Sequence, residues 1–131
     1  MFGVHVEKIG DVAAILCEGR MISSDAAFKL RDEVRRQRDA HIVLLDLSEL
    51  GFLGGDVLGM LVILQAWTRD LGIQFKLFDP PPGVRRSLQR LHSTNELEIA
   101  SMDDVLFMLH WEGPREPIIE SVSKAPGLKA A

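Results

Sequence analysis

The pattern of apolar and polar residues places a buried strand and an apolar helix at the centre of the chain. Residues 42–47 read IVLLDL, an almost unbroken apolar run typical of a strand buried on both faces of a parallel sheet. A second apolar run begins at Val57 and stops at Gly72, which is long enough for a helix. A turn over residues 48–55 joins the two. Because the loop after a central strand is a common functional location in open α/β sheets, residues 51–59 are the first candidate site.

The sequence before this central unit predicts a hairpin and a helix. Residues 2–7 alternate between apolar and polar, Gly10 and Asp11 suit a turn, and residues 12–17 form an apolar strand. A cluster of hydrogen-bonding side chains then supplies an N-cap for a helix. The cluster and the apolar positions at helical spacing behind it are Ser23, Ser24, Asp25, Ala27, Leu30 and Val34.

The sequence after the central unit predicts two more strands and two more helices. Residues 73–78 alternate as a strand, the prolines at 80–82 end it, and residues 97–99 form a short edge strand. Ser101 and Asp104 form a capping-box pattern that opens the last helix. The apolar positions that we expect these two helices to bury are Val84, Leu88 and Leu91 in the first and Val105, Leu106 and Leu109 in the second.

This order of elements predicts an α/β fold, a mixed sheet of about four to five strands with about four helices. Right-handed crossovers put the first helices on one face of the sheet and leave the other face partly covered. The domain is expected to span residues 1–112. Residues 113–131 are rich in glycine and proline and are expected to form a mobile or weakly docked tail.

Composition narrows the function classes. The chain has 131 residues, 47% of them hydrophobic and 26% charged, which indicates one globular domain with a real core. A net charge of −4 gives no overall attraction to nucleic acid. No apolar stretch is long enough for membrane insertion and no signal peptide is recognisable, so a cytoplasmic location is expected. The single Cys17 is expected to be a small buried hydrophobe.

The glycine-rich loop of residues 51–59 raises the question of a nucleotide site. It precedes a helix, as a phosphate-binding loop does, but it lacks the P-loop Lys-Ser/Thr pair and the G-x-G-x-x-G order. Asp56 would place a carboxylate where a phosphate binds, so a capping aspartate in a tight turn is the preferred interpretation. A small α/β nucleotide binder or enzyme that uses this loop, with Asp46 or Asp56, remains the alternative from another class.

We find no pattern that indicates catalysis, a cofactor or a metal. The four histidines fall in separate predicted elements without close pairing, so they predict no metal site. The chain has no G-x-S-x-G elbow and no evident carboxylate pair. We therefore expect no catalytic residues, no cofactor and a protein that is not an enzyme.

The central helix is apolar on nearly all sides, whereas a helix that covers a sheet needs only one apolar stripe. The other side is expected to meet a protein partner or to be covered by the C-terminal tail, through Ile118, Ile119 and Val122. The residues of the stripe are Val57, Met60, Leu64 and Trp67, and those outside it are Leu58, Val62, Ile63 and Ala66.

Four segments together resemble the STAS domain of bacterial anti-sigma factor antagonists, over about residues 3–110. The resemblance implies a STAS-like fold and a protein partner, either a kinase-type anti-sigma factor or a related regulator. A second version implied by the resemblance is a STAS subunit of a lipid-transport ATPase complex. The segments are Glu18 to Ser24, Ile42 to Leu53, Leu58 to Leu61, and the strand, proline and 84–88 run.

The signature loop of this family resembles Phe-(Ile or Met)-Asp-Ser-Ser-Gly-Leu-Gly, in which the first Ser is phosphorylated to switch partner binding. Laid on this chain, the family's Asp falls on Gly54, the phosphoacceptor on Gly55 and the next Ser on Asp56. Gly55 has no hydroxyl, so the resemblance implies a binding module without phospho-switching at this position. The oligomeric state, including a homodimer, is left open. The residues expected to bind the partner are Gly54, Gly55, Asp56, Val57, Leu58, Met60 and Leu61.

Overall fold

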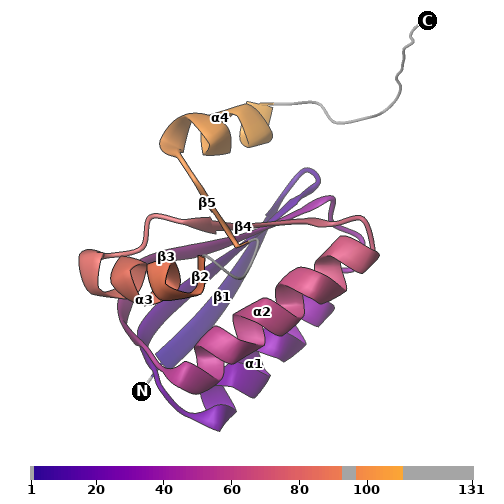
Figure 1. The fold of residues 1–131 in the computed structure, drawn as a ribbon. Helices are drawn as coiled ribbons and strands as arrows, with labels where there is room; N and C mark the ends of the chain where they lie inside the picture. The colour runs from indigo at the N-terminus through magenta and orange to yellow at the C-terminus, as the bar shows by residue number, and fades with distance from the viewer. Residues whose placement is uncertain (1, 93–96, 111–131) are drawn as a thin grey trace, which may run out of the picture.

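A computed structural model describes residues 2–92 and 97–110, which form five strands and four helices (Figure 1). The prediction of an α/β fold with a mixed sheet is confirmed. The expected end of the domain at residue 112 and the tail from residue 113 lie outside the described residues. The elements are β1 (Phe2–Ile9), β2 (Val12–Met21), α1 (Ser24–Arg35), β3 (Ile42–Leu53), α2 (Gly55–Asp70), β4 (Gln74–Phe78), α3 (Pro82–His92), β5 (Glu98–Ala100) and α4 (Met102–His110).

The five strands form one sheet in the order β1-β2-β3-β4-β5. β1 and β2 pair as the predicted antiparallel hairpin, and Gly10 has φ +60 in the turn, a conformation that suits glycine. The pairs β2–β3, β3–β4 and β4–β5 are all parallel. The carboxyl ends of β2 and β3 therefore lie at the same edge of the sheet, where each strand leads into a helix.

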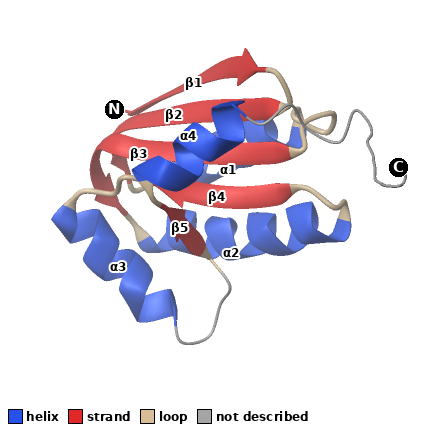
Figure 2. Cartoon of the chain, turned by 90° about the horizontal axis from the view of Figure 1, so that it is seen from above, coloured by secondary structure: helices blue, strands red, loops and turns tan. Residues whose placement is uncertain are grey.

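The main core lies between the sheet and the helix pair α1 and α2, which run side by side on one face (Figures 1 and 2). The hydroxyl of Ser23 caps α1 as predicted, because Ser23 Oγ accepts a hydrogen bond from the Ala26 amide at 3.2 Å. The buried residues of this face come from three adjacent strands and are Ala13, Ile15, Cys17, Val43, Leu45, Leu47, Phe75 and Leu77.

The apolar character of α2 is explained largely by packing within the domain. α2 contacts both the sheet, at β4, and the neighbouring helix α1, so more than one of its sides is covered. Leu58 and Trp67 are half-buried against the core, whereas Ile63 is 60% exposed. The expected broad exposed side of the helix is therefore restricted to a narrow strip around Ile63.

The opposite face of the sheet is only partly covered, by the short helix α4 (Figure 2). Val105 is buried there with Val12, Ile42 and Leu44. The predicted burial of Leu106 and Leu109 is wrong, because these side chains are 46% and 36% exposed. A nine-residue helix on an open sheet face buries only one narrow line of its side chains.

The capping box of α4 is confirmed in both directions. The Asp104 amide donates to Ser101 Oγ and the Ser101 amide donates to Asp104 Oδ2, each at 3.0 Å. These two bonds from Ser101 hold the pKa of Asp104 below its ordinary value.

One predicted boundary is wrong. The stretch 48–55 was expected to be a turn, yet β3 continues to Leu53 and α2 begins at Gly55. The pairing of β2 with β3 shifts register twice, and these irregularities let both strands continue to the Met21–Leu53 pair. The side chain of Leu91, expected in the stripe of α3, lies outside the described side chains.

Candidate functional site

Two loops meet at the carboxyl edge of the sheet. One joins β2 to α1 and the other joins β3 to α2. The Gly54 amide donates to the Met21 carbonyl at 2.8 Å, and Ser24 Oγ donates to Asp56 Oδ2 at 2.8 Å. These two hydrogen bonds link segments about thirty residues apart in sequence and fix the start of α2 against the start of α1.

Two adjacent glycines of this junction have different environments. A Cβ atom at Gly54 would lie 2.9 Å from the Ile22 Cα atom and 3.2 Å from the Ile22 carbonyl oxygen. At Gly55 a Cβ atom would have nothing within 4 Å. Gly54 is therefore required for the close approach of the two loops, whereas position 55 is open to solvent.

The residues expected to bind a partner divide into a buried and an accessible group. Gly55 and Asp56 are exposed and Leu58 is half-buried. Their role in binding stays a prediction. The other four form the buried floor of the junction, so they support the surface without being accessible in this structure: Gly54, Val57, Met60 and Leu61.

Four large apolar side chains around the junction are 44 to 60% exposed. They are Ile22, Phe28, Phe52 and Ile63. The guanidinium carbon of Arg20 lies 5.1 Å from the centre of the Phe52 ring, and that of Arg31 lies 5.0 Å from the centre of the Phe28 ring. We refer to these four side chains, together with Gly55, Asp56 and Leu58, as the junction surface.

Most of these apolar residues were missed by the choice of site residues from sequence. Phe28 lies outside the predicted apolar stripe of its helix, Ala27, Leu30 and Val34, and this misplacement was the available signal. Ile22 and Phe52 lie in segments quoted for the family resemblance, but their exposure depends on how the two loops meet.

The junction does not have the form of a phosphate cradle. The loop of residues 51–59 contains no lysine or arginine. The Asp56 carboxylate lies in the first turn of α2, where it competes with an anion for the helix amides. Among residues 2–92 and 97–110, no three His, Cys, Asp or Glu side chains gather closely enough to hold a metal ion.

Comparison with known proteins decides the family. Residues 4–104 match the sequence model of the STAS domain. The chain belongs to the STAS domain family. This is the fold of anti-sigma factor antagonists and is generally non-catalytic. No curated protein gives a significant match to the sequence.

Solved structures of anti-sigma factor antagonists share the fold of this STAS domain. SpoIIAA in its unphosphorylated form is 14% identical with a TM-score of 0.68, over 82% of this chain and 96% of that one. An anti-sigma factor antagonist from Mycobacterium paratuberculosis is 24% identical with a TM-score of 0.62, over 83% and 94%. RsbS of Moorella thermoacetica is 18% identical with a TM-score of 0.65, over 81% and 93%.

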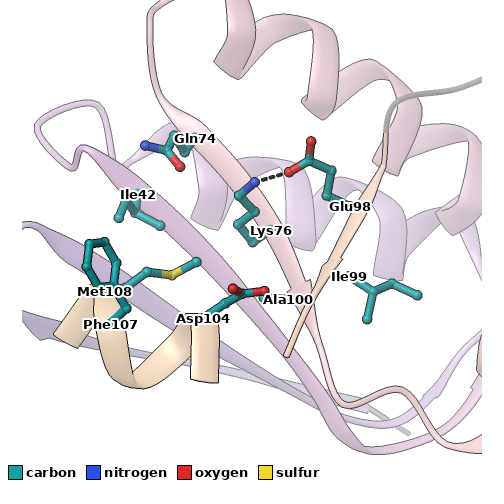
Figure 3. Close-up of a pocket in the computed structure, with 9 residues that line it drawn as sticks. All are labelled: Ile42, Gln74, Lys76, Glu98, Ile99, Ala100, Asp104, Phe107 and Met108. Carbon is teal, nitrogen blue, oxygen red and sulfur yellow. Dashed lines mark hydrogen bonds and ion pairs between the residues drawn. The ribbon is translucent and has the colours of Figure 1, made fainter. Parts of the chain in front are cut away.

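A separate cavity of about 430 Å³ lies between α4 and the strands β4 and β5 of the STAS domain (Figure 3). Its walls are largely apolar, with Ile42, Phe107 and Met108 among them. Lys76 and Glu98 form an ion pair within it, and Asp104 is bonded to Ser101. The cavity lies on the face of the sheet away from α1 and α2, and its charged groups interact with each other or with the α4 cap.

No helix among the described residues is long and apolar enough to cross a membrane. The one cysteine, Cys17, is buried as expected, and burial together with the negative charge of Asp46 raises the pKa of its thiol to about 12. A thiol with this pKa stays protonated at neutral pH and is a poor nucleophile.

Proposed function

We propose that this STAS domain is a non-enzymatic binding module whose junction surface docks a kinase-type anti-sigma factor or a related regulator. The partner class is suggested by the names of the structural relatives, two of which are called anti-sigma factor antagonists. The proposal concerns the face of α1 and α2 and the loops at the carboxyl edge of the sheet, not the cavity under α4.

The observation that carries the proposal is the group of exposed apolar side chains around the Ser24–Asp56 contact. Single exposed apolar residues are common, but a group at the junction of two loops is typical of a protein-binding surface. Aromatic rings and arginines, as in the Arg20–Phe52 and Arg31–Phe28 pairs, are enriched at such interfaces.

We further propose that docking is not switched by phosphorylation at position 55. Glycine has no hydroxyl to accept a phosphoryl group, so an ester cannot form there. Asp56 supplies a fixed negative charge one residue later, but an aspartate carries less charge and fewer acceptor oxygens than a phosphoserine.

Affinity capture with a matched pair of variants tests this proposal. Gly55→Arg places a large charged side chain on the junction surface, and the open space around position 55 lets the domain fold. Met102→Arg places the same charge on the outer side of α4, where Met102 is 58% exposed. Tagged protein is used to capture partners from a lysate of the cells that make it.

We expect an ATP-binding regulator of the serine kinase type that is captured by the wild type and by Met102→Arg and lost with Gly55→Arg. Capture of a transporter ATPase with the same dependence would instead support the lipid-transport version. If no captured protein depends on Gly55, the junction surface is not a docking site. Saturable ATP binding by the purified domain, abolished by Asp56→Ala, would favour the nucleotide-binding alternative.

A further inference from the structure

The two serines at the start of α1 are used differently. Ser23 Oγ accepts the hydrogen bond from the Ala26 amide and so forms the helix cap. Ser24 Oγ is not needed for that cap. Its side chain is exposed, and its hydroxyl points across to the other loop, where it donates to Asp56 Oδ2 at 2.8 Å.

The contact between Ser24 and Asp56 places a hydroxyl on the junction surface where the β3–α2 loop has none. Asp56 directly follows Gly55, so Ser24 lies beside the position at which the family resemblance leads one to expect a phosphoacceptor. The Gly54–Met21 hydrogen bond and the close approach of Gly54 to Ile22 hold the two loops together. The location of the hydroxyl is therefore a fixed property of the fold.

We propose that Ser24 is a phosphorylation site for an ATP-dependent serine kinase, and that its modification breaks the Ser24–Asp56 contact and weakens docking. The inference rests on the proposed function, because it assigns regulation to the same junction surface. A hydroxyl that is exposed, held in place and already bonded to a carboxylate is a suitable acceptor.

The chemical step balances with ATP as the phosphoryl donor. Ser24 Oγ attacks the γ-phosphorus, and an Oγ–P bond forms while the bond from that phosphorus to the bridging oxygen breaks. ADP leaves with the bonding electron pair. The hydroxyl proton passes to the Asp56 carboxylate, which already accepts it in a hydrogen bond, and then to water.

The product has the opposite electrostatic relation to its surroundings. The unmodified hydroxyl donates to Asp56, whereas a phosphoserine has no donor and carries about −1.5 to −2 charges near neutral pH. Asp25 is also exposed next to it, so the new group meets two carboxylates. Repulsion from Asp56 is expected to push the two loops apart and alter the surface that a partner contacts.

Phosphopeptide mapping tests the site directly. The domain is isolated from its own cells and, in parallel, incubated with its captured partner and Mg·ATP. Trypsin releases residues 21–29 as one peptide that contains both serines, and fragment ions distinguish Ser23 from Ser24. We expect the phosphoryl group on Ser24, its loss in Ser24→Ala and its retention in Ser23→Ala.

Partner affinity tests the consequence. Ser24→Glu is expected to weaken binding about tenfold. Asp56→Asn in the same chain removes the repulsion and is expected to restore most of the affinity, whereas a merely structural role of Ser24 would make Ser24→Ala as harmful as Ser24→Glu.

An unmodified Ser24 in both preparations, or a phosphoryl group on another residue, would overturn the inference. If a Gly55-dependent partner is still captured in that case, the proposed function stands and only its regulation through Ser24 falls. If no such partner exists, the proposed function fails, and mapping of the protein from its own cells still decides whether Ser24 is modified.

Discussion

Replacing Gly54 with alanine is expected to lower the free energy of unfolding by about 1 to 3 kcal/mol. The added Cβ atom would lie 2.9 Å from the Ile22 Cα atom, and this neighbour belongs to the backbone. It cannot move aside as the end of a flexible side chain would, so the β2–α1 loop must shift. That shift would also strain the Gly54–Met21 and Ser24–Asp56 hydrogen bonds.

Gly55→Ala is the matched control for this prediction. It adds the same methyl group one residue later, where a Cβ atom meets nothing within 4 Å. Position 55 is the first residue of α2, so alanine is expected to stabilise the domain by up to about 1 kcal/mol through the unfolded state. Urea denaturation measures both values. Equal effects of the two substitutions would mean that the loops are not packed as described.

Raising the pH is expected to destabilise the domain through Cys17. The thiol has its pKa raised from an ordinary value of 9.0 to about 12 in the folded state, mainly because burial disfavours the thiolate. The unfolded chain therefore loses this proton first. The corresponding stability is fully present below pH 9 and is lost between pH 9 and pH 12, and the total is about 4 kcal/mol.

Cys17→Ala isolates this effect from the other groups that titrate in alkali. The variant leaves a small cavity and is less stable at every pH, but its stability should fall less steeply than that of the wild type above pH 9. Denaturation curves at several pH values measure the two slopes. Parallel slopes would show that the thiol ionises as easily in the folded domain as in the unfolded chain.

The architecture of this domain could be predicted from sequence because its elements have strong local signals. The unbroken run at residues 42–47, the turn at Gly10 and the capping residues Ser23 and Ser101 each have a local physical cause. Spacing along the chain then placed these elements in the right order. The end of β3 was misplaced because the strand continues through register shifts that depend on its partner β2.

The detail of the junction could not be predicted because it depends on contacts between distant residues. Ser24 and Asp56 are separated by 32 positions, and no local pattern predicts their hydrogen bond. Burial was misjudged in α2 and α4 for a related reason. Periodicity indicates which residues share a helix face, but not how many neighbours cover the helix: α2 is covered by both the sheet and α1, while α4 meets only part of a sheet face.

The affinity of the purified partner for two single variants tests the docking claim most directly. Ile63→Glu introduces a charge on α2 within the junction surface, and Leu106→Glu introduces the same charge on α4, on the other face of the sheet. Both positions are exposed, so both variants are expected to fold, which circular dichroism checks. Calorimetric titration then gives the dissociation constants. We expect binding weakened about a hundredfold by Ile63→Glu and changed less than about twofold by Leu106→Glu, since burial of an unpaired charge is costly only inside the interface. The opposite ranking, with Leu106→Glu the damaging change, would contradict docking at the junction surface and place the interface on α4.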